Sequence, residues 1–122
     1  MDNKAWAQEV AKKIKEKELA VAKRNVGKVP YTAENGVFND CSGKEIGWWT
    51  NGFWGGMMWQ LYQATKEPVY KESAEELEKK LDAALMNYHV MDHDSGFRWL
   101  PTAVANYRQF GSDESKNRGM LA

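Results

Sequence analysis

Asp92, His93 and Asp94 form the part of this chain whose side chains are best suited to acid–base chemistry. Gly96 permits a sharp turn just after them, and Phe97 is expected to anchor that turn in the core. A carboxylate beside aromatic surface can exchange protons near neutral pH, so Asp94 is a candidate acid or base with His93 next to it. The alternative is a plain turn, in which Asp94 caps the following segment and His93 is solvated.

The segment 48–62 is the second candidate for a site, because it holds four of the six tryptophans and no charged residue. Charged residues make up 28% of the chain, so a segment without any must be buried or must line a pocket. Aromatic side chains beside the polar pair Thr50 and Asn51 are typical of a sugar-binding site. The alternative is a buried core helix, because aromatic and methionine stripes at helical spacing usually belong to the core.

Other kinds of chemistry find little support in the sequence. The spacing within residues 92–94 matches no metal-ligand pattern, and Cys41 has no obvious set of histidine and aspartate partners that would make it a nucleophile. Gly55 and Gly56 lie within an expected helix, so they do not form a glycine-rich loop that binds phosphate. The sequence therefore predicts neither a metal site nor a thiol nucleophile.

The charge pattern bears on which partners the protein can bind. The 17 basic and 17 acidic residues are interspersed, so no basic face indicates a nucleic-acid or anionic-membrane partner. The N-terminus lacks the basic-then-apolar pattern of a signal peptide, and the charge-free window is too polar to span a membrane. Cys41 is the single cysteine, which fits a reducing compartment. These features predict a soluble, cytoplasmic protein and leave its oligomeric state open.

Hydrophobic periodicity predicts an all-α chain, without a strand pattern of convincing length. Two loops separate the helices, at residues 26–45 and 88–97, and the first, with about 20 residues, is long enough to suggest a functional role. Caps and breakers place the helix ends. The expected helices cover residues 3–24 and about 51–64, a segment that opens near Pro68, about 101–110, and a segment that opens after a Ser112 cap.

Each helix is expected to bury an apolar face. The helix at 51–64 is apolar on nearly all sides, which predicts an inner helix with Trp59 in the core. Gly55 and Gly56 within it indicate close approach by another backbone or a ligand. The other inward-facing residues are expected to be Trp6, Val10, Ile14 and Val21 in the first helix, Tyr70, Ala74, Leu77, Leu81 and Leu85 in the third, and Val104 and Tyr107 in the fourth.

The turns at residues 64–70 and 110–116 have the same character and lie about 46 residues apart. In each, a small or polar turn with acidic residues opens an outer helix after an aromatic-rich inner one. A period of this length suggests stacked helical hairpins in a toroid or solenoid. No cap, glycine or proline closes the last segment, so we expect residues 1–122 to be the N-terminal part of a single, larger domain, cut within a helix.

Three motifs occur in order along the chain: Trp49-Thr-Asn-Gly-Phe-Trp, continuing with aromatic residues to Tyr62, then Ala64-Thr-Lys-Glu-Pro-Val-Tyr, and then His93-Asp-Ser-Gly-Phe. As an ordered set they resemble the unsaturated glucuronyl hydrolases, glycoside hydrolase family 88, over roughly residues 26–122. The resemblance implies an (α/α)6 barrel, of which this chain would hold the first part.

The resemblance also implies a reaction. The substrates would be oligosaccharides with a 4,5-unsaturated uronic acid at the non-reducing end, and the enzyme would hydrate the C4–C5 double bond. An aspartic acid would protonate C4, water would add at C5, and the hemiketal so formed would rearrange and release the sugar. This differs from the usual displacement at C1 by two carboxylates. Neither a metal nor an organic cofactor is implied.

Site residues also follow from the resemblance. Asp94 matches an aspartate essential to activity, which is expected to position the substrate and stabilise developing charge. His93 is expected to orient the loop or the substrate. Trp49 and Asn51 match the pocket side of the tryptophan motif, where Trp49 would stack on a sugar ring. The principal acid/base aspartate would lie further along, outside residues 1–122, which alone are expected to be inactive.

Two alternatives remain open. An unsaturated rhamnogalacturonyl hydrolase would share the barrel and the chemistry but act on a pectin-derived substrate, although relatives of that kind match the motifs less well. A non-catalytic α-hairpin repeat module would use an aromatic groove to bind glycan or peptide. An aspartate in a later inner-helix loop would favour the enzyme.

Overall fold

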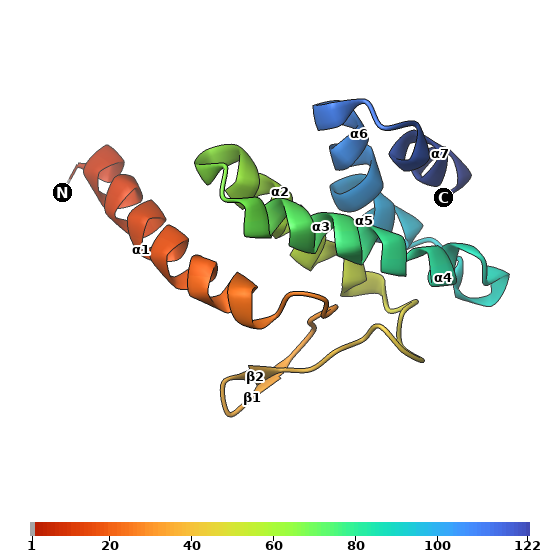
Figure 1. Cartoon of the computed structure of the whole chain (residues 1–122). Helices are drawn as coiled ribbons and strands as arrows, with labels where there is room; N and C mark the ends of the chain where they lie inside the picture. The colour runs from red at the N-terminus through yellow and green to blue at the C-terminus, as the bar shows by residue number, and fades with distance from the viewer. Residues whose placement is uncertain (1) are drawn as a thin grey trace.

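The computed structural model describes residues 2–122, which form helices and one very small β-hairpin (Figure 1). The prediction of an all-α chain is therefore confirmed, whereas closure into a barrel stays a prediction. In order, with η marking a short 3-10 or π segment, the elements are α1 (Asn3–Arg24), β1 (Ala33–Glu34), β2 (Val37–Phe38), η1 (Trp49–Gly52), α2 (Phe53–Thr65), α3 (Pro68–Lys80), α4 (Asp82–Leu85), η2 (Tyr88–Val90), α5 (Ser95–Trp99), η3 (Leu100–Val104), α6 (Ala105–Phe110) and α7 (Asp113–Leu121).

Helix α1 begins and ends where the sequence predicted. At its start the Asp2 side chain accepts a hydrogen bond from the Lys4 backbone N–H. The prediction of which face of α1 points inward is largely wrong, because Val21 is buried but Trp6 and Ile14 are about half exposed. The reason is that α1 runs away from the other helices and packs through its C-terminal end (Figure 1).

The loop at residues 26–45 contains the hairpin β1–β2, which the sequence analysis did not predict. Asn35 and Gly36 connect the strands with φ angles of 51° and 78°, a conformation that an Asn-Gly pair adopts readily in a two-residue hairpin turn. Each strand has only two residues, so alternation of apolar and polar side chains gave no signal. The Asp40 carboxylate steadies the loop by accepting a hydrogen bond from the Val29 N–H at 2.9 Å.

Helices α2 and α3 lie side by side at the centre of the molecule (Figure 1). The expected helix starts at Pro68 and at a Ser112 cap are confirmed, and Lys66 ends α2 in the left-handed conformation. Trp59 lies in the core, as predicted, and so does the α3 stripe, with Leu85 partly buried. The central core residues are Trp54, Met58, Trp59, Tyr70, Ala74, Leu77 and Leu81.

Gly55 and Gly56 let a second segment approach α2 closely, as their positions predicted. A side chain at Gly55 would place its Cβ 2.8 Å from the Thr102 side chain, and one at Gly56 would lie 2.8 Å from the Pro101 Cβ. Carbon atoms in a packed interior do not tolerate such distances without moving. The neighbour is η3, so these two glycines serve helix packing.

The fourth helix starts earlier than predicted and turns a different face to the core. Segments α5, η3 and α6 follow one another without a break from Ser95, and η3 has π geometry, which accommodates Pro101 and rotates the residues after it. The expectation that Val104 and Tyr107 face the core is wrong, because Tyr107 is exposed and Val104 is only partly buried. The buried residues of this stretch are Arg98, Trp99, Thr102, Ala103 and Asn106.

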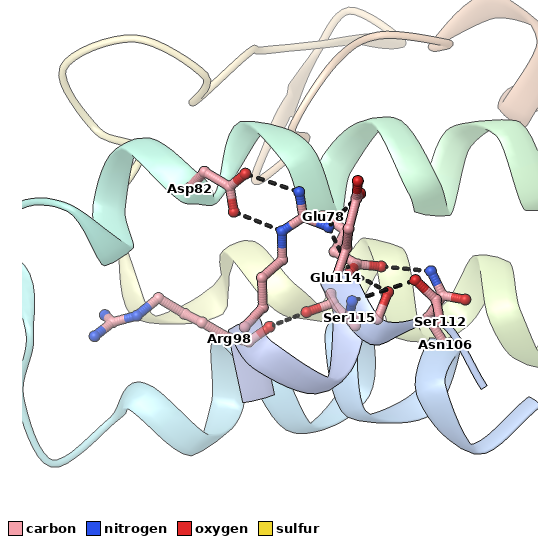
Figure 2. Close-up of polar contacts among 9 residues, drawn as sticks. Glu78, Asp82, Arg98, Asn106, Ser112, Glu114 and Ser115 are labelled. Atoms are coloured by element: carbon pink, nitrogen blue, oxygen red, sulfur yellow. Dashed lines mark hydrogen bonds and ion pairs between the residues drawn. The ribbon is translucent and has the colours of Figure 1, made fainter. Parts of the chain in front are cut away.

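Buried polar contacts hold α7 against α3 (Figure 2). The Glu78 carboxylate is buried and accepts hydrogen bonds from Asn106 Nδ2 at 2.7 Å and Ser115 Oγ at 2.6 Å. Arg118 pairs with Glu78 at 3.1 Å and makes two hydrogen bonds to the Asp82 carboxylate, which raise the pKa of Arg118 above its ordinary value. Because both Glu78 oxygens have partners, burial of this charge is compensated.

Candidate functional site

The two predicted site segments meet where η1 crosses the start of α5. Gly52 makes this crossing possible, because a Cβ there would lie 2.3 Å from the carbonyl oxygen of Phe97 and 2.5 Å from that of Arg98. No side chain fits at such distances from backbone atoms. The crossing brings the centroid of the Trp49 ring within 5.7 Å of that of Phe97, which lies in the motif that carries Asp94.

Trp49, Phe53 and Phe97 form a cluster of rings at the surface, called here the aromatic triad. Each pair of rings packs edge to face, with centroids 5.7 to 5.8 Å apart. Between 38% and 47% of each residue is exposed, so Phe97 is not the core anchor that we expected, and α2 is not buried on all sides. Trp99 is the buried anchor instead. The aromatic triad therefore leaves apolar ring surface exposed on this side of the described residues.

Asp94 directly precedes α5, and its side chain is 26% exposed. Its backbone N–H donates a hydrogen bond to the Asp92 carboxylate at 3.0 Å. Within the described part of the chain the Asp94 side chain makes no capping hydrogen bond to α5, so the capping part of the plain-turn alternative is wrong, while its expectation of a solvated His93 is confirmed. The His93 side chain is 90% exposed, with Nε2 at 3.6 Å from Asp94 Oδ2. The structure thus places a solvent-accessible carboxylate next to an imidazole.

Arg98 is a residue of this site that sequence reasoning missed. Its guanidinium is fully buried and donates from Nη1 to the Gly47 carbonyl oxygen at 2.7 Å. From Nη2 it donates to the Val90 carbonyl oxygen at 2.8 Å and to Asp92 Oδ1 at 3.0 Å. It thereby joins the loop before the tryptophans to the turn that carries Asp94. No local sequence pattern predicts this role, because arginine is mostly exposed in folded proteins.

The contacts of Asp92 predict a dependence of stability on pH. The hydrogen bond from the Asp94 N–H and the nearby Arg98 guanidinium hold the pKa of Asp92 below its ordinary value. A carboxylate whose pKa is lower in the folded than in the unfolded state stabilises the fold at pH values above the unfolded-state pKa, which is about 3.9. This stabilisation is lost as the pH falls through the folded-state pKa. We therefore expect Asp92→Asn to destabilise the protein at neutral pH, and the difference from wild type to shrink below about pH 4.

Denaturant titrations of both proteins at a series of pH values would measure this difference. Asp113→Asn, which changes an exposed carboxylate at the start of α7, is a suitable control. A difference between wild type and Asp92→Asn that stays constant down to about pH 2 would contradict the assignment, because the unfolded-state carboxyl group takes up its proton below about pH 4 and the contribution to stability must fall from there.

Asn51 lies behind the exposed surface. It is fully buried, and its Nδ2 donates hydrogen bonds to the carbonyl oxygens of Glu45 at 2.8 Å and Ile46 at 2.9 Å. These bonds fix the loop that leads into η1, and so they support Trp49. The structure therefore shows a supporting role for Asn51, and contact between Asn51 and substrate stays a prediction.

Two of the pockets lie at the N-terminal part of the tryptophan segment. One, of about 500 Å³, is lined by Trp48 and by residues of the loop before it. The other, of about 330 Å³, lies beside Phe53. Neither is lined by Asp94 or Trp49. Asp94 and Trp49 are partly exposed outside these two pockets.

The other groups relevant to chemistry are the metal-ligating side chains and the thiol of Cys41. Within residues 2–122, no three or more histidine, cysteine or carboxylate side chains are grouped so that they could hold a metal ion. Burial raises the pKa of the Cys41 thiol, which makes it a poor nucleophile. Over the same described range, no helix combines the length and the apolar character needed to cross a membrane.

Known proteins with similar sequences carry consistent names. The chain is 31% identical over 75 residues to the unsaturated chondroitin disaccharide hydrolase of Streptococcus pneumoniae, in an alignment that covers 61% of this chain and 19% of that protein. It is 33% identical over 60 residues to the unsaturated glucuronyl hydrolase of a Bacillus species, covering 48% of this chain and 16% of that protein. The resemblance to the unsaturated glucuronyl hydrolases is confirmed.

A third relative, the unsaturated chondroitin disaccharide hydrolase of Streptococcus agalactiae, is 34% identical over 61 residues, covering 49% of this chain and 15% of that protein. The alignments span less than a fifth of the relatives' own length, at most 19% for the three proteins named. No protein-family model matches the chain, and no solved structure matches it.

Proposed function

We propose that this chain is part of a glycoside hydrolase that removes a 4,5-unsaturated uronic acid from the non-reducing end of an oligosaccharide. The observation that carries the proposal is the crossing at Gly52, which brings Trp49 of one motif next to Phe97 of the motif that contains Asp94. The relatives are named for unsaturated chondroitin disaccharides and unsaturated glucuronyl groups, which favours a glycosaminoglycan-derived substrate.

The proposed reaction begins at the C4–C5 double bond. A proton is added to C4, water adds to C5 and loses a proton, and the hemiketal so formed opens and releases the rest of the sugar. Trp49 offers a partly exposed ring on which a sugar can stack. The solvent-accessible Asp94 carboxylate positions the substrate and stabilises the positive charge that develops as C4 is protonated. His93, beside it, orients the loop or the substrate.

The resemblance extends the proposal beyond the described residues. The barrel would be an (α/α)6 barrel formed with further helical hairpins. The principal acid/base aspartate would come from a part of that barrel outside residues 1–122. The proposed reaction needs neither a metal nor an organic cofactor, and a cytoplasmic location fits the free thiol of Cys41.

The full-length protein should consume an unsaturated chondroitin disaccharide. Hydration removes the conjugated double bond, so the absorbance of the unsaturated uronic acid should fall while free sugar appears in equal amount. A saturated chondroitin disaccharide is the control and should not react. Faster turnover of an unsaturated rhamnogalacturonan disaccharide would favour the pectin-directed alternative. Glycan binding without loss of absorbance would favour the non-catalytic module.

A further inference from the structure

The hydrogen bonds of Arg98 connect two segments that are separate in the sequence. Gly47, which accepts from Nη1, directly precedes the two adjacent tryptophans. Val90 and Asp92, which accept from Nη2, lie in the turn that leads to Asp94. One guanidinium therefore contacts the residue that comes two positions before the Trp49 motif and the turn that comes directly before the His93 motif.

The free-energy cost of burying the Arg98 side chain shows that stability alone does not explain its position. Arg98 is fully buried, while the carboxylate that pairs with it, Asp92, is 46% exposed. The Nε atom of Arg98 is buried without a partner among the described residues. Burying a guanidinium has a large desolvation cost. Proteins in which apolar side chains replace a buried ion pair are often as stable as the original, or more stable. The rigid fork of arginine is better suited to fixing the directions of several acceptors at once.

The contacts reach Asp94 through one intermediate atom. Asp92 Oδ1 accepts a hydrogen bond from Arg98 Nη2 and a second one from the Asp94 N–H, each at 3.0 Å. On the opposite side, Gly47 is pressed against Val90, where a Cβ would lie only 2.6 Å from the Val90 Cβ. A shift of residues 90–94, called here the Asp94 turn, relative to residues 45–48, called here the tryptophan loop, would therefore break the bonds of Arg98.

We propose that Arg98 is a positioning residue that fixes the Asp94 turn at a set distance from the tryptophan loop. This inference rests on the proposed function, in which a sugar stacked on Trp49 must present its double bond to the site that contains Asp94. A misplacement of about 1 Å between reacting groups can lower a rate about 100-fold. Lysine keeps the charge of Arg98 but lacks the planar fork, so it cannot hold all the acceptors in place.

The test compares variants of the full-length protein in the turnover assay with unsaturated chondroitin disaccharide. We expect Arg98→Lys to lower kcat about 100-fold with a KM within a few-fold of wild type, at a temperature where unfolding curves show that it is folded. The matched control is Arg118→Lys, which changes an arginine in the polar contacts between α3 and α7. It should reduce stability and leave kcat within about 3-fold of wild type.

A second variant keeps the test decisive if Arg98→Lys does not fold. Asp92→Ala removes the atom that links Arg98 to Asp94, and because Asp92 is partly exposed, the variant should fold. We expect a loss in kcat of about 10-fold or more. Where Arg98→Lys folds, the double variant should be no slower than Arg98→Lys alone, because both changes interrupt the same contact.

The possible outcomes separate this inference from the proposed function. An inactive wild-type protein would reject the proposed function before any variant is compared. An active wild type with a normal kcat in folded Arg98→Lys, or in Asp92→Ala, would overturn the positioning role. The positioning role would also be overturned if the fold-losses in kcat of the two single variants multiply in the double variant. Multiplied losses mean that the two changes act independently, because independent effects add in free energy.

Discussion

Replacement of Asp94 by asparagine should lower kcat at least 100-fold in the full-length protein and leave its fold intact. The substitution keeps the size of the side chain and removes the charge that is proposed to stabilise the transition state, and the loss of one such electrostatic contact typically costs about 100- to 1,000-fold. Stability should change little, because the Asp94 side chain is partly exposed and makes no capping hydrogen bond within the described residues.

Turnover of the unsaturated disaccharide, followed by the loss of absorbance, measures this effect, and unfolding curves confirm that the variant is folded. Asp113→Asn again serves as a control, because it removes an exposed carboxylate at the start of α7. It should retain wild-type activity. Near-normal turnover by Asp94→Asn would remove Asp94 from the catalytic site and with it the residue-level mechanism.

Trp59→Ala should lower the free energy of unfolding by about 3–5 kcal/mol, because removal of a large buried ring leaves a cavity. Trp59 is almost fully buried between α2 and its neighbours, and its ring packs against Tyr62 and Phe110. Trp49→Ala should behave differently, since the Trp49 ring is 38% exposed and lies in the aromatic triad. Its loss should raise KM for the disaccharide and cost clearly less stability.

Denaturant unfolding and steady-state kinetics on the same two variants separate a core tryptophan from a site tryptophan. Phe53→Ala tests whether the neighbouring ring of the aromatic triad shares the role of Trp49. If Trp49→Ala leaves KM unchanged and acts on stability alone, Trp49 is a structural residue, and the sugar-stacking surface proposed for it is wrong.

Local chemistry explains which parts of the fold were predictable. The ends of α1, the start of α3 at Pro68 and the Ser112 cap depend on interactions within a few residues, so the sequence places them well. The face that a helix buries depends on what packs against it. Trp6 and Ile14 have the spacing of a core stripe, but α1 packs only through its C-terminal end, so the stripe is exposed.

The register of the fourth helix was unpredictable for a related reason. The π geometry of η3 shifts the buried face from Val104 and Tyr107 to residues such as Thr102 and Asn106, and periodicity assumes that no such shift occurs. At the site, motif resemblance selected Asp94. The role of Arg98 depends on where distant carbonyl groups lie after folding, which a local pattern does not contain.

The glycine at the crossing of η1 and α5 has a consequence for how the protein can adapt to its ligands. The backbone of Gly52 lies so close to that of Phe97 and Arg98 that any side chain at position 52 would push the two motifs apart. The spacing between the motifs therefore depends on a glycine at this position. Differences in glycan preference among proteins that share this crossing should therefore reside in side chains and outer loops, while the spacing of the two motifs remains constant.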